Sequence, residues 1–118
     1  MSKILSEDII EALASDEEVS PELKRLWAKA RKASEFLKAL ANENRLLILC
    51  ILSEHERSVT ELEQLLSLSQ SSVSQQLARL RLDGLVDSRR DGRIVYYSLA
   101  DEPTRQFIKA IYDKFCRD

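Results

Sequence analysis

LSQSSVSQQLARLRLDG, residues 68–84, is the stretch that decides the fold of this chain. Ser69 is a residue type favoured at helix N-caps, and Gly84 follows the run as a helix-ending glycine does. The spacing therefore predicts a helix between them. Its apolar residues recur at helical spacing and form one stripe, made of Val73, Leu77 and Leu80.

The remaining face of this helix carries hydrogen-bonding side chains. Short polar residues lie near its N-terminus, and arginines follow. A helix that enters the DNA major groove needs this division, because base edges are met by polar groups and phosphates by arginines. An ordinary amphipathic helix with a solvated face is the alternative, and the flanking sequence has to separate the two. The candidate DNA contacts on this helix are Gln70, Ser71, Ser72, Ser74, Gln75 and Arg79.

The segment before this stretch predicts a second short helix. Ser58 or Thr60 can cap it, and four apolar residues are expected to point inward. A brief turn at residues 67–69 then joins the two helices. Two short helices with a tight turn between them form a helix-turn-helix. The inward residues are Val59, Leu62, Leu65 and Leu66.

The pattern after Gly84 changes to that of strands. LVDSRR and RIVYYSLA flank the dipeptide Asp91-Gly92, which predicts a two-stranded hairpin with a type I′ turn. Arg89, Arg90 and Arg93 gather at its tip. A hairpin tip can simply be a place where charge is solvated. Because this one follows a helix-turn-helix, we interpret it as a DNA-binding wing whose arginines lie along phosphates.

Helices are expected at both ends of the chain. Ser6 can cap a short helix, residues 15–20 look like a charged linker, and Ser20-Pro21 is a strong helix start. The long helix that follows carries an apolar seam with a repeat near seven, suited to a neighbouring helix or a partner subunit. Its residues are Leu23, Leu26, Trp27, Ala30, Ala33, Leu37 and Leu40.

Two further helices complete the expected architecture. Asn42 is expected to cap RLLILCIL, which is apolar nearly all round and should be buried with Cys50 inside it. Asp101 is expected to cap the last helix, whose apolar face holds Phe107, Ile108, Ile111 and Phe115. The predicted fold is mainly α, an α+β winged helix with five or six helices and a two-stranded wing. We expect an acidic lead segment over residues 1–20, a DNA-binding and dimerisation domain over 21–118, and a homodimer formed through the terminal helices.

Composition fits a globular chain with an uneven charge. The 118 residues are 44% hydrophobic and 32% charged, with two glycines and two prolines. The net charge is −2, yet residues 1–22 hold seven acids against Lys3 alone, so the remainder is net positive. No apolar run approaches the roughly 20 residues of a membrane span, and the N-terminus lacks a signal pattern. A cytoplasmic protein, nucleoid-associated when bound to DNA, is therefore expected.

Three segments together resemble the ArsR/SmtB family of winged helix-turn-helix repressors. They are KALANENRLLILCIL, SVTELEQLL and LSQSSVSQQLARLRLDGLVDSRRDGRIVYYSL, and the likeness covers roughly residues 36–99. The resemblance implies a homodimer that binds double-stranded operator DNA and responds to a chemical inducer.

The ligands of the metal-sensing members are missing here. One form of the family has a CVC motif where this chain has Ser58-Val59-Thr60, and another uses Asp and His pairs on the terminal helix, which here contains no histidine. His55 is the only histidine, and the two cysteines are far apart in sequence. Neither kind of metal site is expected, and no cofactor is expected.

The cysteines resemble those of the reactive-sulfur-sensing branch, the BigR and SqrR proteins and the related HlyU regulators. In that branch a cysteine on the corresponding helix pairs with one on the terminal helix, which implies that Cys50 and Cys116 form a redox-sensing pair. Persulfides would then be the inducer, and bridging would release DNA. Taken alone, each cysteine can equally be a packing or incidental residue.

Several functions remain open at this stage. The preferred one is a dithiol repressor; an HlyU-like activator that displaces a silencing protein, or a regulator with an unknown inducer and non-functional cysteines, would use the same fold. A structural helical dimer is the plainest choice. An enzyme is not expected, because the chain has no CxxC motif, phosphate loop or acid/base cluster around either cysteine.

Overall fold

The computed structural model describes residues 4–14 and 20–117, which fall into two compact units. The first unit reaches Leu37 and the second begins at Lys38. The first contains α1 (Glu7–Ala14) and most of α2 (Pro21–Leu40). All but the last residue of the predicted linker over 15–20 lies outside the described residues.

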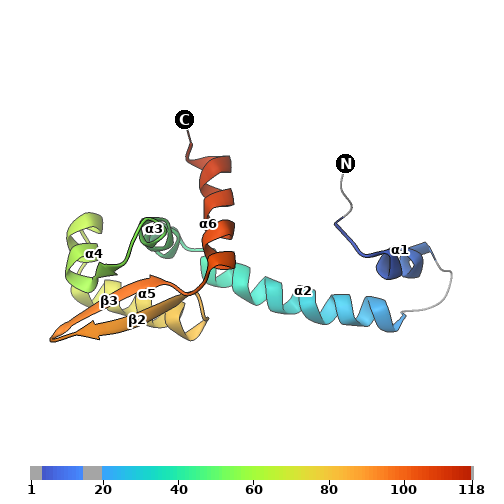
Figure 1. The fold of residues 1–118 in the computed structure, drawn as a ribbon, viewed down its shortest axis with the longest axis horizontal. Coiled ribbons are helices and arrows are strands. Elements are labelled where there is room, and N and C mark those ends of the chain that lie inside the picture. Colours follow the sequence, from blue (N-terminus) through green and yellow to red (C-terminus); the bar gives the residue numbers. More distant parts are fainter. Residues whose placement is uncertain (1–3, 15–19, 118) are drawn as a thin grey trace. The chain divides into compact units, whose positions relative to one another are not determined.

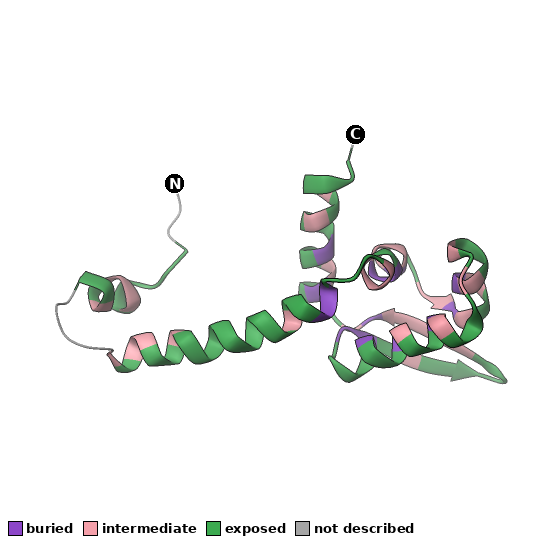
Figure 2. Cartoon of the chain, turned by 180° about the vertical axis from the view of Figure 1, so that it is seen from behind, coloured by how far each residue is buried: buried purple, intermediate pink, exposed green. Residues whose placement is uncertain are grey.

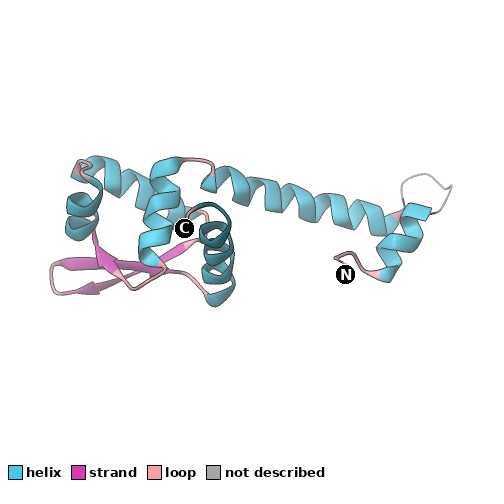
Figure 3. Ribbon diagram, turned by 90° about the horizontal axis from the view of Figure 1, so that it is seen from above, coloured by secondary structure: helices cyan, strands magenta, loops and turns pink. Residues whose placement is uncertain are grey.

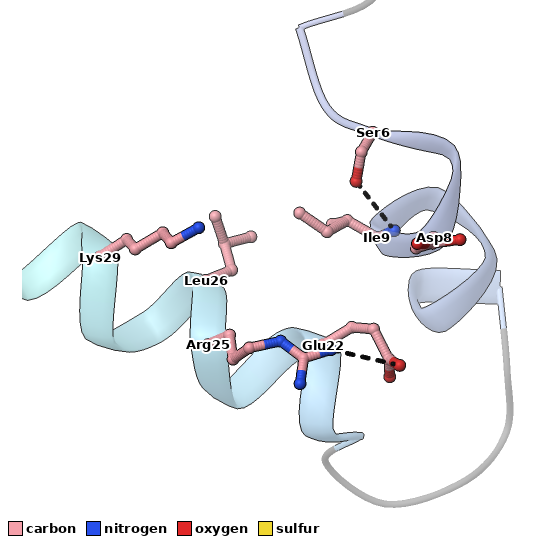
Figure 4. Close-up of a pocket in the computed structure, with 7 residues that line it drawn as sticks. All are labelled: Ser6, Asp8, Ile9, Glu22, Arg25, Leu26 and Lys29. Atoms are coloured by element: carbon pink, nitrogen blue, oxygen red, sulfur yellow. Dashed lines mark hydrogen bonds and ion pairs between the residues drawn. The ribbon is translucent and has the colours of Figure 1, made fainter.

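Both N-terminal helices start where the sequence predicts. The Ser6 hydroxyl accepts a hydrogen bond from the Ile9 backbone N–H at 3.5 Å, and the Ser20 hydroxyl accepts one from Leu23 at 3.2 Å. Ile9 and Leu26 point toward one another across a small pocket of about 170 Å³ (Figure 4). An ion pair between Glu22 and Arg25, 3.5 Å apart, lies at the edge of this pocket.

The seam of α2 is largely open to solvent in the single chain (Figure 2). Leu40 is buried, but Trp27 is 63% exposed and Leu37 is 51% exposed. Ala39 and Leu40, which belong to the second unit, are the buried residues of this helix. Trp27, Ala30, Ala33 and Leu37 of the predicted seam are therefore left exposed by the described residues of the chain.

The second unit is a winged helix-turn-helix, as predicted (Figure 1). The tip of its β-hairpin extends past the helices, and the sheet lies to one side of them (Figure 3). Its elements are α3 (Glu43–Leu52), β1 (Arg57–Ser58), α4 (Val59–Leu66), α5 (Gln70–Leu82), β2 (Val86–Asp91), β3 (Ile94–Leu99) and α6 (Glu102–Phe115).

The sheet has three strands, where the sequence predicted two. The antiparallel order is β1-β3-β2, with Arg57 opposite Tyr97 and Arg89 opposite Tyr96. Strand β1 is only two residues long, which is too short to show any alternation of apolar and polar residues. Pattern analysis therefore missed it.

The wing turn also differs from the prediction. Asp91 pairs with Ile94, so the two loop residues are Gly92 and Arg93. Gly92 has φ +63°, but Ser67 is the only non-glycine with positive φ in the described part of the chain. A type I′ turn needs positive φ at both central positions, so the turn has the φ pattern of type II′.

The core forms where α3, α4, α5, α6 and the sheet meet. The stripe of α5 is confirmed, because its three residues are fully buried. Two expectations were wrong: α3 is not buried all round, since Leu47 is 50% exposed, and Leu65 of α4 is 53% exposed. The most deeply buried side chains are Ile48, Leu49, Leu52, Leu62, Val73, Leu77, Leu80, Leu85, Val86 and Ile108.

Local hydrogen bonds fix both ends of α5. The Ser69 hydroxyl accepts from the Ser72 N–H at 3.2 Å. At the other end Gly84 has φ +76°, its N–H donates to the Arg81 carbonyl, and the Leu85 N–H donates to the Leu80 carbonyl. This paired arrangement is a Schellman motif, so the predicted cap and terminating glycine are both confirmed.

The remaining caps also follow the sequence. Asn42 caps α3 and Asp101 caps α6, through hydrogen bonds of 3.1 and 2.8 Å to backbone N–H groups. Of the two candidate caps for α4, the structure selects Ser58, which forms a capping box with Glu61. Ser67 ends that helix in the left-handed conformation, with φ 53°.

Replacing Ser58 with alanine removes one half of this capping box. We expect the free energy of unfolding to fall by about 1 kcal/mol, which is typical for loss of a serine cap. Thr60→Ala is the matched control, because Thr60 is exposed and caps nothing. Urea unfolding followed by circular dichroism measures both; equal losses in the two variants would contradict the cap assignment.

Candidate functional site

The polar face predicted on α5 is exposed at the start of the helix. Gln70, Ser71, Ser74 and Gln75 are solvent-exposed, whereas Ser72 is half-buried. The Ser72 backbone N–H is held by the Ser69 cap. Most of the predicted contacts are thus on one accessible surface, held rigidly by the buried stripe beneath it.

A hollow connects this surface to the wing. It has a volume of about 200 Å³ and brings Gln70 of α5 next to Arg93 of the wing turn. The start of α4 contributes Ser58 and Thr60 to the same hollow. Sequence reasoning treated these two residues only as caps. The start of α5 and the wing turn therefore line the same hollow.

The four predicted arginines have different surroundings. Arg90 and Arg93 are exposed and make no ion pair with another described residue. Arg79 pairs with Asp83 on its own helix, with 2.8 Å between Nε and Oδ2. Arg89 is bound by both oxygens of the Glu56 carboxylate. Only the first two have no carboxylate partner in the described chain.

Sequence analysis did not identify Glu56. It lies 33 residues before Arg89, in the segment between α3 and β1, so no local spacing connects them. The hydrogen bond from Arg89 holds the pKa of the Glu56 carboxyl below its usual range. This carboxyl therefore stays ionised to a lower pH than an unpaired glutamate does.

The cysteines lie on the two elements that the sequence assigned. Cys50, on α3, is half-buried, and Cys116, at the C-cap of α6, is exposed. Both are free thiols. Burial raises the pKa of the Cys50 thiol, and the negative charge of a Cys116 thiolate raises it further.

Cys50 lines an open cavity of about 460 Å³ between α3 and α6. Leu47 and Ile51 supply its apolar wall, and Tyr112 enters from α6. The Cys116 backbone N–H donates to the Tyr112 carbonyl at 2.9 Å, one helical turn along α6. Cys50 was expected inside a buried helix; in the structure it is on the α3 face that opens toward α6.

Two kinds of site are absent from the described residues. No three His, Cys, Asp or Glu side chains within 4–14 and 20–117 are arranged as metal ligands. Within the same ranges, none of the helices is long and apolar enough to cross a membrane.

Known proteins resemble this chain in sequence. The family profile described as "Bacterial regulatory protein, arsR family" matches residues 42–88. "Transcriptional activator HlyU" of Vibrio cholerae is 43% identical over 95 residues, covering 80% of this chain and 88% of that protein. "Biofilm growth-associated repressor" of Agrobacterium fabrum is 41% identical, covering 80% of each chain.

Solved structures agree with the sequence comparison. Reduced HlyU from Vibrio cholerae has a TM-score of 0.76 at 43% identity and covers 80% of this chain and all of that one. The transcriptional repressor BigR from Xylella fastidiosa has a TM-score of 0.71 at 36% identity, covering 79% and 92%. These relatives are regulators of transcription and not enzymes. With this sequence likeness and a winged helix-turn-helix in common, the chain belongs to the ArsR family of bacterial transcriptional regulators.

Proposed function

We propose that this regulator is a cytoplasmic homodimeric repressor that binds double-stranded operator DNA when its thiols are reduced. The observation that carries the DNA-binding part is the hollow joining Gln70 to Arg93. One predicted groove contact of α5 and one exposed arginine of the wing turn line this hollow, which supports a shared DNA-binding face. The groove contacts would be Gln70, Ser71, Ser72, Ser74 and Gln75, and the backbone contacts Arg79, Arg89, Arg90 and Arg93.

Exposed apolar residues on the terminal helices support the dimer. Phe115 is 74% exposed and Tyr112 48% on α6, while Trp27 is 63% exposed on α2. Tyr112 and Phe115 are three residues apart and so are neighbours on the surface of α6, and a contiguous exposed apolar patch is typical of a surface that a partner covers. A dimer would also present two recognition helices to two half-sites, which increases affinity and specificity.

The positions of the two thiols support a sensing role, because Cys116 is exposed and the half-buried Cys50 lines an open cavity. A low-molecular-weight persulfide would transfer its terminal sulfur to one cysteine thiolate, releasing the parent thiol and leaving a cysteine persulfide. The second thiolate would then attack the inner sulfur and expel hydrosulfide, which closes a Cys50–Cys116 disulfide. A further persulfide reacting before closure leaves extra sulfur in the bridge. The bridge would tie α6 to α3 and disfavour the DNA-bound dimer.

An activator is the second candidate. The relative HlyU is named a transcriptional activator, and its identity with this chain is as high as that of the repressors. Both candidates use the same DNA face and thiols. The two are distinguished by measuring transcription from the promoter upstream of the gene for this protein, which a repressor lowers and an activator raises.

Cys116→Ser tests the dithiol. We expect this variant to bind operator DNA like the wild type but not to be released by glutathione persulfide, because one sulfur cannot close the bridge. Intact mass measured after a thiol-capping reagent is added gives the parallel chemical result. In a wild-type chain treated with persulfide, neither cysteine should take up the reagent. Release of Cys116→Ser by persulfide would contradict the mechanism.

Arg90→Ala tests the wing. The variant should bind DNA more weakly, and the slope of log affinity against log salt should become shallower by about 0.9 per lost phosphate contact. Fluorescence anisotropy over a salt series measures both quantities. An unchanged affinity and slope would remove the wing from the DNA interface.

Phe115→Asp tests the dimer surface. A charge at this exposed apolar position should dissociate the dimer while leaving the fold of each chain intact, as followed by sedimentation velocity and circular dichroism. Ala110→Asp is the control, since it adds the same charge to an exposed position about 140° around α6. Equal effects of the two variants would argue against a dimer surface at Phe115.

A further inference from the structure

The wing is attached to the body of the domain by an ion pair that crosses the middle strand. Arg89 on β2 donates Nε to Glu56 Oε2 at 2.8 Å and Nη2 to Glu56 Oε1. Glu56 directly precedes β1, and β3 lies between β1 and β2. The side chain of Arg89 therefore reaches across the sheet to the segment that links α3 to β1.

The ring of Tyr96 on the middle strand supports this crossing. Tyr96 is the cross-strand partner of Arg89, and the guanidinium lies 4.6 Å from the ring centroid. A planar guanidinium stacked on an aromatic ring and held by two parallel hydrogen bonds has a fixed orientation. We call these three residues, Glu56, Arg89 and Tyr96, the clasp.

Glu56 of the clasp is also close in sequence to α3, the helix that carries Cys50. Ser53, three residues before Glu56, donates its hydroxyl to the Cys50 carbonyl at 2.5 Å. Its own carbonyl accepts a hydrogen bond from Arg105 of α6. The segment from Ser53 to Glu56 is thus held by α3 and α6 at one end and by the wing at the other.

We propose that Arg89 is a positioning residue that orients the wing through Glu56, and that Arg90 and Arg93 make the phosphate contacts. This rests on the proposed DNA face and revises one residue of it. Arg89 already makes two hydrogen bonds to a carboxylate, whereas Arg90 and Arg93 have no such partner among residues 4–14 and 20–117. The wing then meets DNA at an angle that the α3–β1 segment sets.

The direction in which one substitution changes DNA affinity distinguishes a positioning role of the ion pair from a purely electrostatic one. Glu56→Gln removes a negative charge beside the wing, so electrostatics alone predicts tighter DNA binding. Loss of the clasp predicts binding that is several-fold weaker, with an unchanged salt slope because no phosphate contact is lost. Arg89→Lys keeps the charge but cannot make the paired hydrogen bonds, and it should weaken binding to the same extent.

Asp87→Asn is the matched control, because it removes a negative charge from β2, the strand that carries Arg89, without changing a residue of the clasp. It should bind DNA as tightly as the wild type or more tightly. The double variant Glu56→Gln/Arg89→Lys should bind DNA no more weakly than either single variant, because both substitutions disrupt the same interaction between residues 56 and 89. Tighter binding by Glu56→Gln, or additive losses in the double variant, would overturn the proposal.

A second measurement does not depend on DNA. Amide hydrogen exchange in β2 and β3 of the free protein should become faster in Glu56→Gln and in Arg89→Lys but not in Asp87→Asn. Unchanged exchange in the first two variants would also overturn the clasp. If exchange changes as expected while Arg90→Ala leaves DNA affinity intact, the wing is not part of the DNA interface, and Arg89 orients the wing without any effect on DNA binding.

Discussion

Burial of the α5 stripe is the constraint on which the functional surface depends. Val73, Leu77 and Leu80 are fully buried, so the helix has only one rotation about its axis that keeps them out of water. Each such side chain contributes roughly 1.5–3 kcal/mol relative to an exposed one. That burial turns Gln70, Ser71, Ser74 and Gln75 outward, where they are exposed to solvent.

Periodicity and local caps made much of this fold predictable. The helices, their caps at Ser20, Asn42, Ser69 and Asp101, and the hairpin after Gly84 all follow from residues within a few positions of one another. Features that depend on distant residues could not be found this way. Strand β1 exists only because Arg57 and Ser58 meet β3, and the partner of Arg89 lies in a different part of the chain. The exposure of Leu47 and Leu65 likewise depends on which faces neighbouring helices cover.

Sequence analysis named candidate site residues but not the neighbours that surround them. It grouped the wing arginines together, but the Glu56 carboxylate binds Arg89, while Arg90 and Arg93 have no carboxylate partner among the described residues. It also expected Cys50, one of the proposed sensing pair, to lie in a helix buried all round, whereas this thiol lines an open cavity. In both cases the residue's role depends on a neighbour contributed by a remote segment, Glu56 in one and Tyr112 in the other.

The turn between α4 and α5 has a consequence for how relatives of this protein can diverge. Ser67 adopts the left-handed conformation to end α4, and two residues later Ser69 caps α5. An added residue in this turn would separate the two helix ends and alter how α5 packs on α4, whereas a change among the exposed side chains of α5 disturbs neither end. The length of the turn is therefore more tightly constrained than the surface of α5.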